Sequence, residues 1–325
     1  MSTGLASRAS AKLSIVIAAL AAGALWLSAS DAAAQAGFAV GPGKCGDCHR
    51  EEAKTWEGTK HAKSFQEIHR KDSAKAILAA AGGDANMRRN AVCTNCHYTM
   101  TQADASARPN ATQGPSCESC HGSASNWITV HNDYGGPNVK REQETPAHKT
   151  ERLNKAKAAG MIHSSMLFDI AENCASCHSL ARKGVDPAVM AKMIDAGHPA
   201  GSSFELVQYS QGSVRHRFYP PDVTKNAELD NAGLARMFVI GHTAALVVAA
   251  GAAGKVQNPK YEATRKGIED SARKALDAVK GQVPEVAAFL AAPTEANGRK
   301  VAEAVASKDV SAQVASLLPA KNTYK

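Results

Sequence analysis

Every one of the eight cysteines in this chain belongs to a C-x-x-C pair, and a histidine directly follows each pair. The four segments span residues 45–49, 93–97, 117–121 and 174–178. This is the spacing of c-type haem attachment, in which two thiols form thioethers with one porphyrin and the adjacent imidazole reaches the iron from the same side. A zinc ribbon needs no histidine after each pair, a thioredoxin-like site needs a βαβ context, and disulfides between such close cysteines are strained.

The motifs therefore predict four covalently attached haem c groups with their iron. The anchoring thiols are those of Cys45, Cys48, Cys93, Cys96, Cys117, Cys120, Cys174 and Cys177. The proximal iron ligands are His49, His97, His121 and His178. Aromatic residues make up only 5% of the chain, and four porphyrins would supply the large, flat apolar bodies that such a core otherwise lacks.

The pattern of apolar residues predicts a mainly α fold, a haem-cored multihaem cytochrome c with long loops. Helices are predicted at 49–82, 151–178 and 186–196, loops at 98–116 and 132–150, and a short β hairpin at 204–219. The first helix is expected to stop at the glycine pair Gly82-Gly83.

The composition changes after the proline pair at 220–221, because the rest of the chain is rich in alanine and contains no cysteine. Its helical periodicity predicts a C-terminal Ala-rich helical bundle packed on the haem region. The 17-residue apolar run at 237–253 contains a histidine and glycines, which favours a buried helix over a membrane span of about 20 apolar residues. The expected organisation is a signal peptide (1–36), a tetrahaem cytochrome domain (37–220) and a C-terminal helical region (221–325).

Residues 1–36 have the features of a Sec-type secretory signal peptide. Arg8 and Lys12 precede a 15-residue apolar run, and small residues follow it as cleavage candidates. The run is short for a membrane span, so the mature chain is expected in the periplasm with no span. Haem propionates would offset the formal net charge of +8, so the basic balance does not indicate nucleic-acid binding. The expected partner is a periplasmic redox protein or oxidoreductase.

The segments around the motifs carry a resemblance to a known family. Trp56, Thr59 and the run His61-Ala62-Lys63 follow the first motif, the third stands in Gly-Pro-Ser-Cys-Glu-Ser-Cys-His-Gly at 114–122, and His131 comes ten residues after the third motif. In these features, and over about residues 40–220, the chain resembles the tetrahaem cytochrome c-554 family. Members of that family serve hydroxylamine oxidoreductase in ammonia-oxidising bacteria. The resemblance implies that His61 binds the iron of the third haem, His131 that of the fourth and His198 that of the first.

The second haem, on Cys93 and Cys96, is the open question. In the family it is five-coordinate, with no protein ligand opposite the motif histidine. His163 and His216 are both candidates for that position in this chain, and His163 is preferred. The second haem is therefore expected either to remain five-coordinate or to be closed by one of these two histidines.

Several haems held in one small protein form a path for electrons, and bis-histidine ligation favours one-electron exchange with little rearrangement. The sequence thus predicts an electron carrier rather than an enzyme. It would be a periplasmic tetrahaem c-type cytochrome that exchanges electrons with a periplasmic oxidoreductase of a respiratory chain, in the nitrogen cycle or in oxyanion reduction. The alternative is a redox enzyme that acts on a small ligand such as nitric oxide at a five-coordinate second haem.

Overall fold

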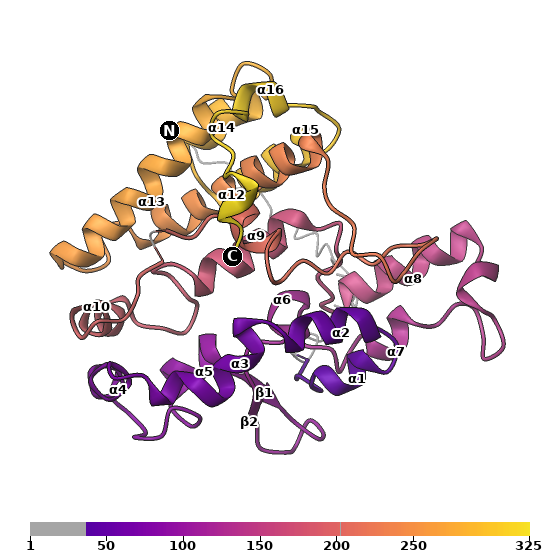
Figure 1. Ribbon diagram of the computed structural model, residues 1–325, viewed down its shortest axis with the longest axis horizontal. Helices are drawn as coiled ribbons and strands as arrows, with labels where there is room; N and C mark the ends of the chain where they lie inside the picture. Colours follow the sequence, from indigo (N-terminus) through magenta and orange to yellow (C-terminus); the bar gives the residue numbers. More distant parts are fainter. Residues whose placement is uncertain (1–36, 202) are drawn as a thin grey trace, which may run out of the picture. The chain divides into compact units, whose positions relative to one another are not determined.

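The computed structural model describes residues 37–201 and 203–325, so the expected signal peptide lies outside the described residues. The described chain is mainly helical, as predicted (Figure 1). The first elements are α1 (Pro42–Gly46), α2 (Arg50–Glu57), α3 (Lys60–Glu67), η1 (Ile68–Arg70), α4 (Ala74–Ala81), α5 (Ala91–His97), β1 (Thr99–Thr101), β2 (Asn110–Gln113), α6 (Cys117–His121), α7 (Ile128–His131), η2 (Arg141–Gln143) and α8 (Pro146–Ala158). The later elements are α9 (Leu167–Cys177), α10 (Pro187–Asp195), α11 (Leu206–Ser210), α12 (Asn231–Ala252), α13 (Pro259–Asp277), α14 (Glu285–Ala291), α15 (Glu295–Val305), α16 (Ser311–Val314) and η3 (Lys321–Thr323).

The single helix predicted at 49–82 is wrong, because this segment forms α2, α3 and α4. Gly58 follows the last residue of α2, and the Thr59 hydroxyl accepts a hydrogen bond from the Ala62 N–H (3.2 Å) to begin α3. A capping threonine satisfies a backbone donor that a continuous helix would pair internally, so it marks a new helix start. The predicted stop is present, since α4 ends at Gly82 with a φ of 68°.

Two short segments also differ from the sequence-based prediction. Residues 204–219 contain α11 rather than a hairpin, because the Glu205 carboxylate accepts hydrogen bonds from the Val207 and Gln208 N–H groups and caps the helix. The loop expected at 98–116 contains the antiparallel pair β1–β2. The elements α11, β1 and β2 are only 5, 3 and 4 residues long, a length at which local side-chain contacts outweigh apolar periodicity.

Each cysteine motif lies on a helix or at a helix end. The first motif (45–49) spans the end of α1 and the residue before α2, and the second motif (93–97) ends α5. The third motif (117–121) forms α6, and the fourth motif (174–178) ends α9. Residues three and four positions apart share one face of a helix. In the second and third motifs, which lie wholly within α5 and α6, the cysteines and the histidine therefore point to one side, as attachment to one porphyrin requires.

A large apolar core joins α9 to the C-terminal helices. At its centre is α12, which packs against α9, α13 and α15 (Figure 1). Phe168 of α9, Phe238 of α12 and Phe289 of α14 are all buried in this core. A Cβ atom on Gly298 of α15 would lie 2.7 Å from the Phe168 ring, so the glycine allows α15 to approach α9 closely. The C-terminal helices therefore support the helix that ends in the fourth motif, and residues Gly37–Lys325 form one compact unit.

Among the described residues, α12 is the one helix long and apolar enough to cross a membrane, and 67% of its apolar window is buried inside the protein. His242 lies on this helix with its ring centroid 4.4 Å from that of Phe238. Burial lowers the pKa of His242 to about 4, so its imidazole is neutral and packs as part of the core.

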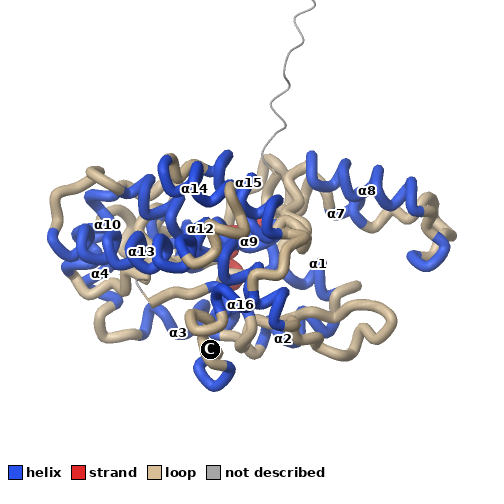
Figure 2. Tube along the Cα trace, turned by 90° about the horizontal axis from the view of Figure 1, so that it is seen from above, coloured by secondary structure: helices blue, strands red, loops and turns tan. Residues whose placement is uncertain are grey.

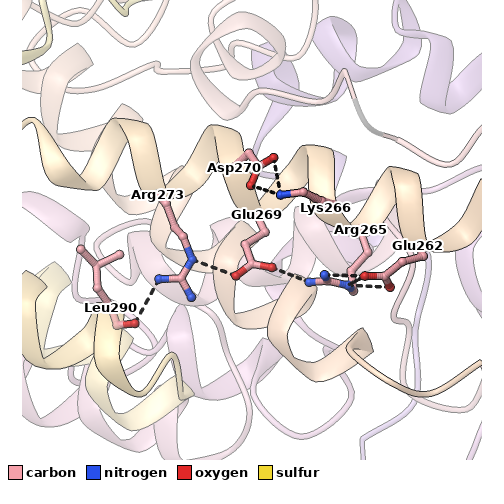
Figure 3. Close-up of polar contacts among 7 residues, drawn as sticks. All are labelled: Glu262, Arg265, Lys266, Glu269, Asp270, Arg273 and Leu290. Carbon is pink, nitrogen blue, oxygen red and sulfur yellow. Dashed lines mark hydrogen bonds and ion pairs between the residues drawn. The ribbon is translucent and has the colours of Figure 1, made fainter.

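A row of ion pairs runs along α13 (Figure 3). Arg265 contacts Glu262 at 2.6 Å and Glu269 at 2.5 Å, and Glu269 also contacts Arg273 at 2.8 Å. Arg273 donates a further hydrogen bond to the Leu290 carbonyl (3.1 Å), which connects α13 to α14. Exposed ion pairs contribute about 0–1 kcal/mol each, so this row orients the two helices while the apolar core supplies most of their stability.

A pair of acidic side chains lies where α9 meets α15, and it makes stability depend on pH. Burial raises the pKa of Glu172 to about 7, and Glu295 raises it further through repulsion and a shared hydrogen bond. Because the pKa in the folded protein lies above the ordinary value of 4.5, the protonated Glu172 side chain stabilises the fold. This contribution to the free energy of unfolding is fully present below pH 4.5 and is lost as the pH rises through about 7. We expect the melting temperature of the holoprotein, followed by circular dichroism, to fall between about pH 5 and about pH 8.

The variant Glu172→Gln is expected to remove much of this pH dependence, because an amide has no proton to lose. The matched control is Glu285→Gln at the exposed start of α14, which should keep the slope of the wild-type protein. An equal slope in the wild type and in Glu172→Gln would show that the pair does not titrate in this range.

Candidate functional site

Each motif histidine faces a second histidine ring. The ring centroids are 6.3 Å apart for His49 and His131, 6.0 Å for His97 and His198, 6.1 Å for His121 and His216, and 5.8 Å for His178 and His61. The four facing histidines come from α7, the loop after α10, the segment after α11, and α3. Distant parts of the chain thus complete each motif.

These pairs fit an iron ion between two imidazoles. A metal–imidazole bond is about 2 Å long, so two imidazoles bound to one ion have ring centroids about 6 Å apart. All four measured separations, from 5.8 to 6.3 Å, agree with this value. The two cysteines and two histidines at each motif therefore fit a covalently attached haem c.

The structure pairs the facing histidines differently from the resemblance. The expected partners of His61, His131 and His198 were the third, fourth and first motifs, whereas these rings face the fourth, first and second motifs. The pairing differs because the fold brings different segments of the chain together. The Phe38 N–H donates to the Ser125 hydroxyl (2.9 Å), and the Ser125 N–H donates to the Phe38 carbonyl (3.2 Å). These bonds join the segment before the first motif to the segment before α7, which carries His131.

The second motif, which sequence reasoning left open, has His198 on its far side. His163, the preferred candidate, does not face the second motif. Its Nδ1 contacts the Ser165 hydroxyl (2.8 Å), and it lies near enough to His121 of the third motif to lower the pKa of that histidine. His216, the other candidate, faces His121. The sequence signal for His198 was its loop position directly after the helix predicted at 186–196, but nothing in the sequence indicated which motif it would face.

Backbone carbonyls orient several of these rings. Nδ1 of His121 lies 2.8 Å from the Ile162 carbonyl, Nδ1 of His131 lies 2.6 Å from the Ile128 carbonyl, and Nδ1 of His216 lies 2.6 Å from the Val214 carbonyl. A carbonyl only accepts, so the proton sits on Nδ1 and Nε2 is left free for iron. Burial, with a smaller effect of neighbouring imidazoles, lowers the pKa of both His97 and His178 to about 4. They are therefore neutral, as metal ligation requires.

Thiols from different motifs lie in contact with one another. The pairs are Cys45 with Cys117, Cys120 with Cys174, and Cys96 with Cys177. The hydrogen bond with Cys117, followed by burial, raises the pKa of the Cys45 thiol. The contacts join the first motif to the third, the third to the fourth and the fourth to the second. We call this arrangement the motif row, in the order first, third, fourth, second.

A buried carboxylate connects the first and third motifs. Glu118 lies inside the third motif and is only 6% exposed. It accepts hydrogen bonds from the N–H groups of Val40 (2.9 Å) and Gly41 (2.7 Å), which precede the first motif, and from Ala124 (2.7 Å). Sequence reasoning missed Glu118, because an acidic residue within a C-x-x-C pair is ordinarily solvated.

An arginine connects the second and fourth motifs. The Arg182 guanidinium donates to the Asn95 side chain (3.1 Å) in the second motif, and to Asn173 (3.1 Å) and Ser176 (2.7 Å) at the fourth. Asn173 in turn donates to the Ser119 carbonyl (2.6 Å) of the third motif. This polar framework therefore holds three attachment segments in one arrangement. Arg182 was also missed, since a lone arginine in a loop carries no sequence signal.

Comparison with known proteins agrees with this site. Residues 44–122, which contain the first three motifs, match the family described as cytochrome c554 and c-prime. Cytochrome c-554 of Nitrosomonas europaea is 29% identical over 163 residues, which cover 46% of this chain and 61% of that protein. The chain therefore matches less than two thirds of this relative's length. No solved structure matches the chain.

The family and the motifs imply the same cofactor, covalently bound haem c. The family match ends directly after the third motif, while the fourth motif and three of the four facing histidines lie beyond it. Over residues 44–122, the chain is similar to the cytochrome c-554 family.

Proposed function

We propose that this chain is a periplasmic tetrahaem c-type cytochrome that carries electrons between redox proteins, with each haem iron held between two histidines. The observation that carries the proposal is the histidine pair at every one of the four motifs. When bound, haem would supply one-electron chemistry through its iron. The two imidazoles of each pair would hold the iron in both oxidation states, which would keep the rearrangement small.

The second motif separates the carrier from the alternative enzyme. A small ligand such as nitric oxide needs an open axial position, and the His198 ring lies where that ligand would bind, 6.0 Å from His97 between centroids. The placement of His198 therefore supports a carrier.

The motif row supports transfer within the chain. Contacts between thiols of neighbouring motifs place consecutive attachment sites next to one another. The expected signal peptide at 1–36 supports export, and a one-electron oxidoreductase of the periplasm is the matching class of partner. The family resemblance favours a nitrogen-cycle oxidoreductase within that class.

The test is electron paramagnetic resonance of the purified, oxidised holoprotein, together with a haem count from the pyridine haemochrome spectrum. We expect four haems per chain and low-spin ferric signals only. A high-spin signal from a full haem equivalent, or fewer than four haems per chain, would contradict the proposal.

A further inference from the structure

The motif row has charges of opposite sign at its two ends. At the first and third motifs, the Glu118 carboxylate is buried and accepts hydrogen bonds from three N–H groups. Glu118 lies inside the third motif, and its hydrogen bonds to Val40 and Gly41 bring it beside the first. Two further carboxylates lie close by in the sequence, Asp47 inside the first motif and Glu52 on α2 directly after it. The cysteines that would anchor the first and third haems thus lie in a negative electrostatic environment.

At the second and fourth motifs the charge is positive. The Arg182 guanidinium is half-buried, and the three acceptors described above are amide and hydroxyl oxygens. Within the described part of the chain, no carboxylate forms an ion pair with it. These contacts place its positive charge beside the second and fourth motifs. The third motif, in the row between the two ends, contains Glu118 and is also joined to Arg182 through Asn173, which donates to the Ser119 carbonyl.

Three other cations near the row, all on α8, are either paired or act elsewhere. Arg152, beside His131, is bound to Glu144 at 2.7 Å, which offsets its charge. Lys149 and Lys157 of α8 act on His163, which belongs to no histidine pair described above. Figure 2 shows α8 beside α7, on the opposite side of the molecule from α10 and α13. Glu118 and Arg182 are thus charged side chains whose hydrogen bonds connect neighbouring motifs at the two ends of the row.

We propose that Glu118 and Arg182 order the reduction potentials along the motif row, with the lowest potential at the first motif and the highest at the second. A negative charge near a haem opposes the added electron, and a positive charge stabilises it. Both side chains act through space and touch no reacting atom. The inference rests on the proposed function, because it needs a haem at each motif. An electron supplied by an external one-electron donor is held most strongly at the end of the row near Arg182.

The test is a spectroelectrochemical titration of the holoprotein with dithionite and ferricyanide, which resolves the midpoint potentials. Arg182→Gln removes the positive charge. We expect the highest midpoint potential to fall by about 59 mV, which is a tenfold change in a one-electron reduction equilibrium. The lowest midpoint potential should stay unchanged. Arg182→Lys keeps the charge but loses the fork of donors, so it should retain the highest midpoint. Glu118→Gln is expected to raise the lowest midpoint and to leave the highest unchanged.

The matched controls are Arg273→Gln and Glu285→Gln, which remove one charge of each sign on α13 and α14, far from the row in sequence and outside its contacts. Neither should move any midpoint. If Arg182→Gln leaves the highest midpoint potential unchanged or moves the lowest one, the inference is wrong. The Arg182 experiment remains a valid test even if Glu118→Gln does not fold. Haem count and spin state are measured first on every sample. A wild type without four low-spin haems refutes the proposed function, whereas four low-spin haems with unshifted midpoints refute only the inference.

Discussion

Replacing His198 by alanine is expected to convert about one quarter of the haem iron from low spin to high spin. In the structure the His198 ring faces His97 of the second motif, with centroids 6.0 Å apart, and alanine has no atom that can bind iron. The second haem would then have one protein ligand and an open axial position. Electron paramagnetic resonance of the oxidised holoprotein measures this directly, and the haem count should stay at four because both cysteines of the motif are unchanged.

The same variant is expected to bind carbon monoxide or nitric oxide at about one haem per chain, since the open position accepts a small ligand. The wild-type protein should bind neither at a comparable level. The His198→Ala variant would thus acquire the ligand-binding property that the alternative enzyme requires.

The matched control is His163→Ala. His163 was the preferred ligand from sequence, but in the structure its Nδ1 contacts Ser165. We expect His163→Ala to leave the spin state unchanged. A high-spin signal in His163→Ala together with an unchanged spectrum in His198→Ala would reverse the assignment made here.

The second large effect is expected from removing the fourth haem with the double variant Cys174→Ser and Cys177→Ser. The fourth motif ends α9, and Phe168 and Ala171 of this helix are buried against the C-terminal helices. A missing porphyrin leaves a far larger void than a truncated leucine, which already costs about 2–5 kcal/mol. A loss of about 5 kcal/mol would lower the melting temperature by about 10 °C or more. The measurements are haem count and thermal unfolding.

This variant also interrupts the motif row, because the fourth motif lies between the third and the second. Stopped-flow reduction is therefore expected to become biphasic, with one haem reduced much more slowly than the other two. The matched control is Cys45→Ser with Cys48→Ser, which removes the haem at one end of the row and should keep a single fast phase for the rest. Equal kinetics in the two double variants would show that the thiol contacts do not describe the path.

The local chemistry of the site could be predicted from the sequence because each motif is contiguous. Two cysteines and a histidine within five residues share one helical face, as in α6 (Cys117–His121), so attachment needs no knowledge of the rest of the fold. Helix content was predictable because apolar periodicity is also a local pattern along the chain. The finer boundaries were not, since the cap at Thr59 and the cap at Glu205 depend on single hydrogen bonds.

The second half of each site was not predictable from the sequence. His61, His131 and His198, which were predicted as iron ligands, each face a motif histidine, but at a different motif from the one expected, and His216 faces the third motif instead of the second. Glu118 and Arg182 were missed entirely. All of these relations connect residues far apart along the chain, as in the contact between Asn95 and Arg182.

By itself, then, the sequence determined where haem would be attached, through eight cysteines and four histidines in contiguous motifs, and it determined a mainly helical fold. Only the tertiary structure decided which histidine lies opposite each motif, in what order the motifs follow one another, and where the unpaired charges lie. The physical reason is that attachment depends on neighbours within one helical turn, whereas axial pairing and electrostatics depend on distances between segments that meet only when the core around α12 and the contacts of Glu118 and Arg182 have formed.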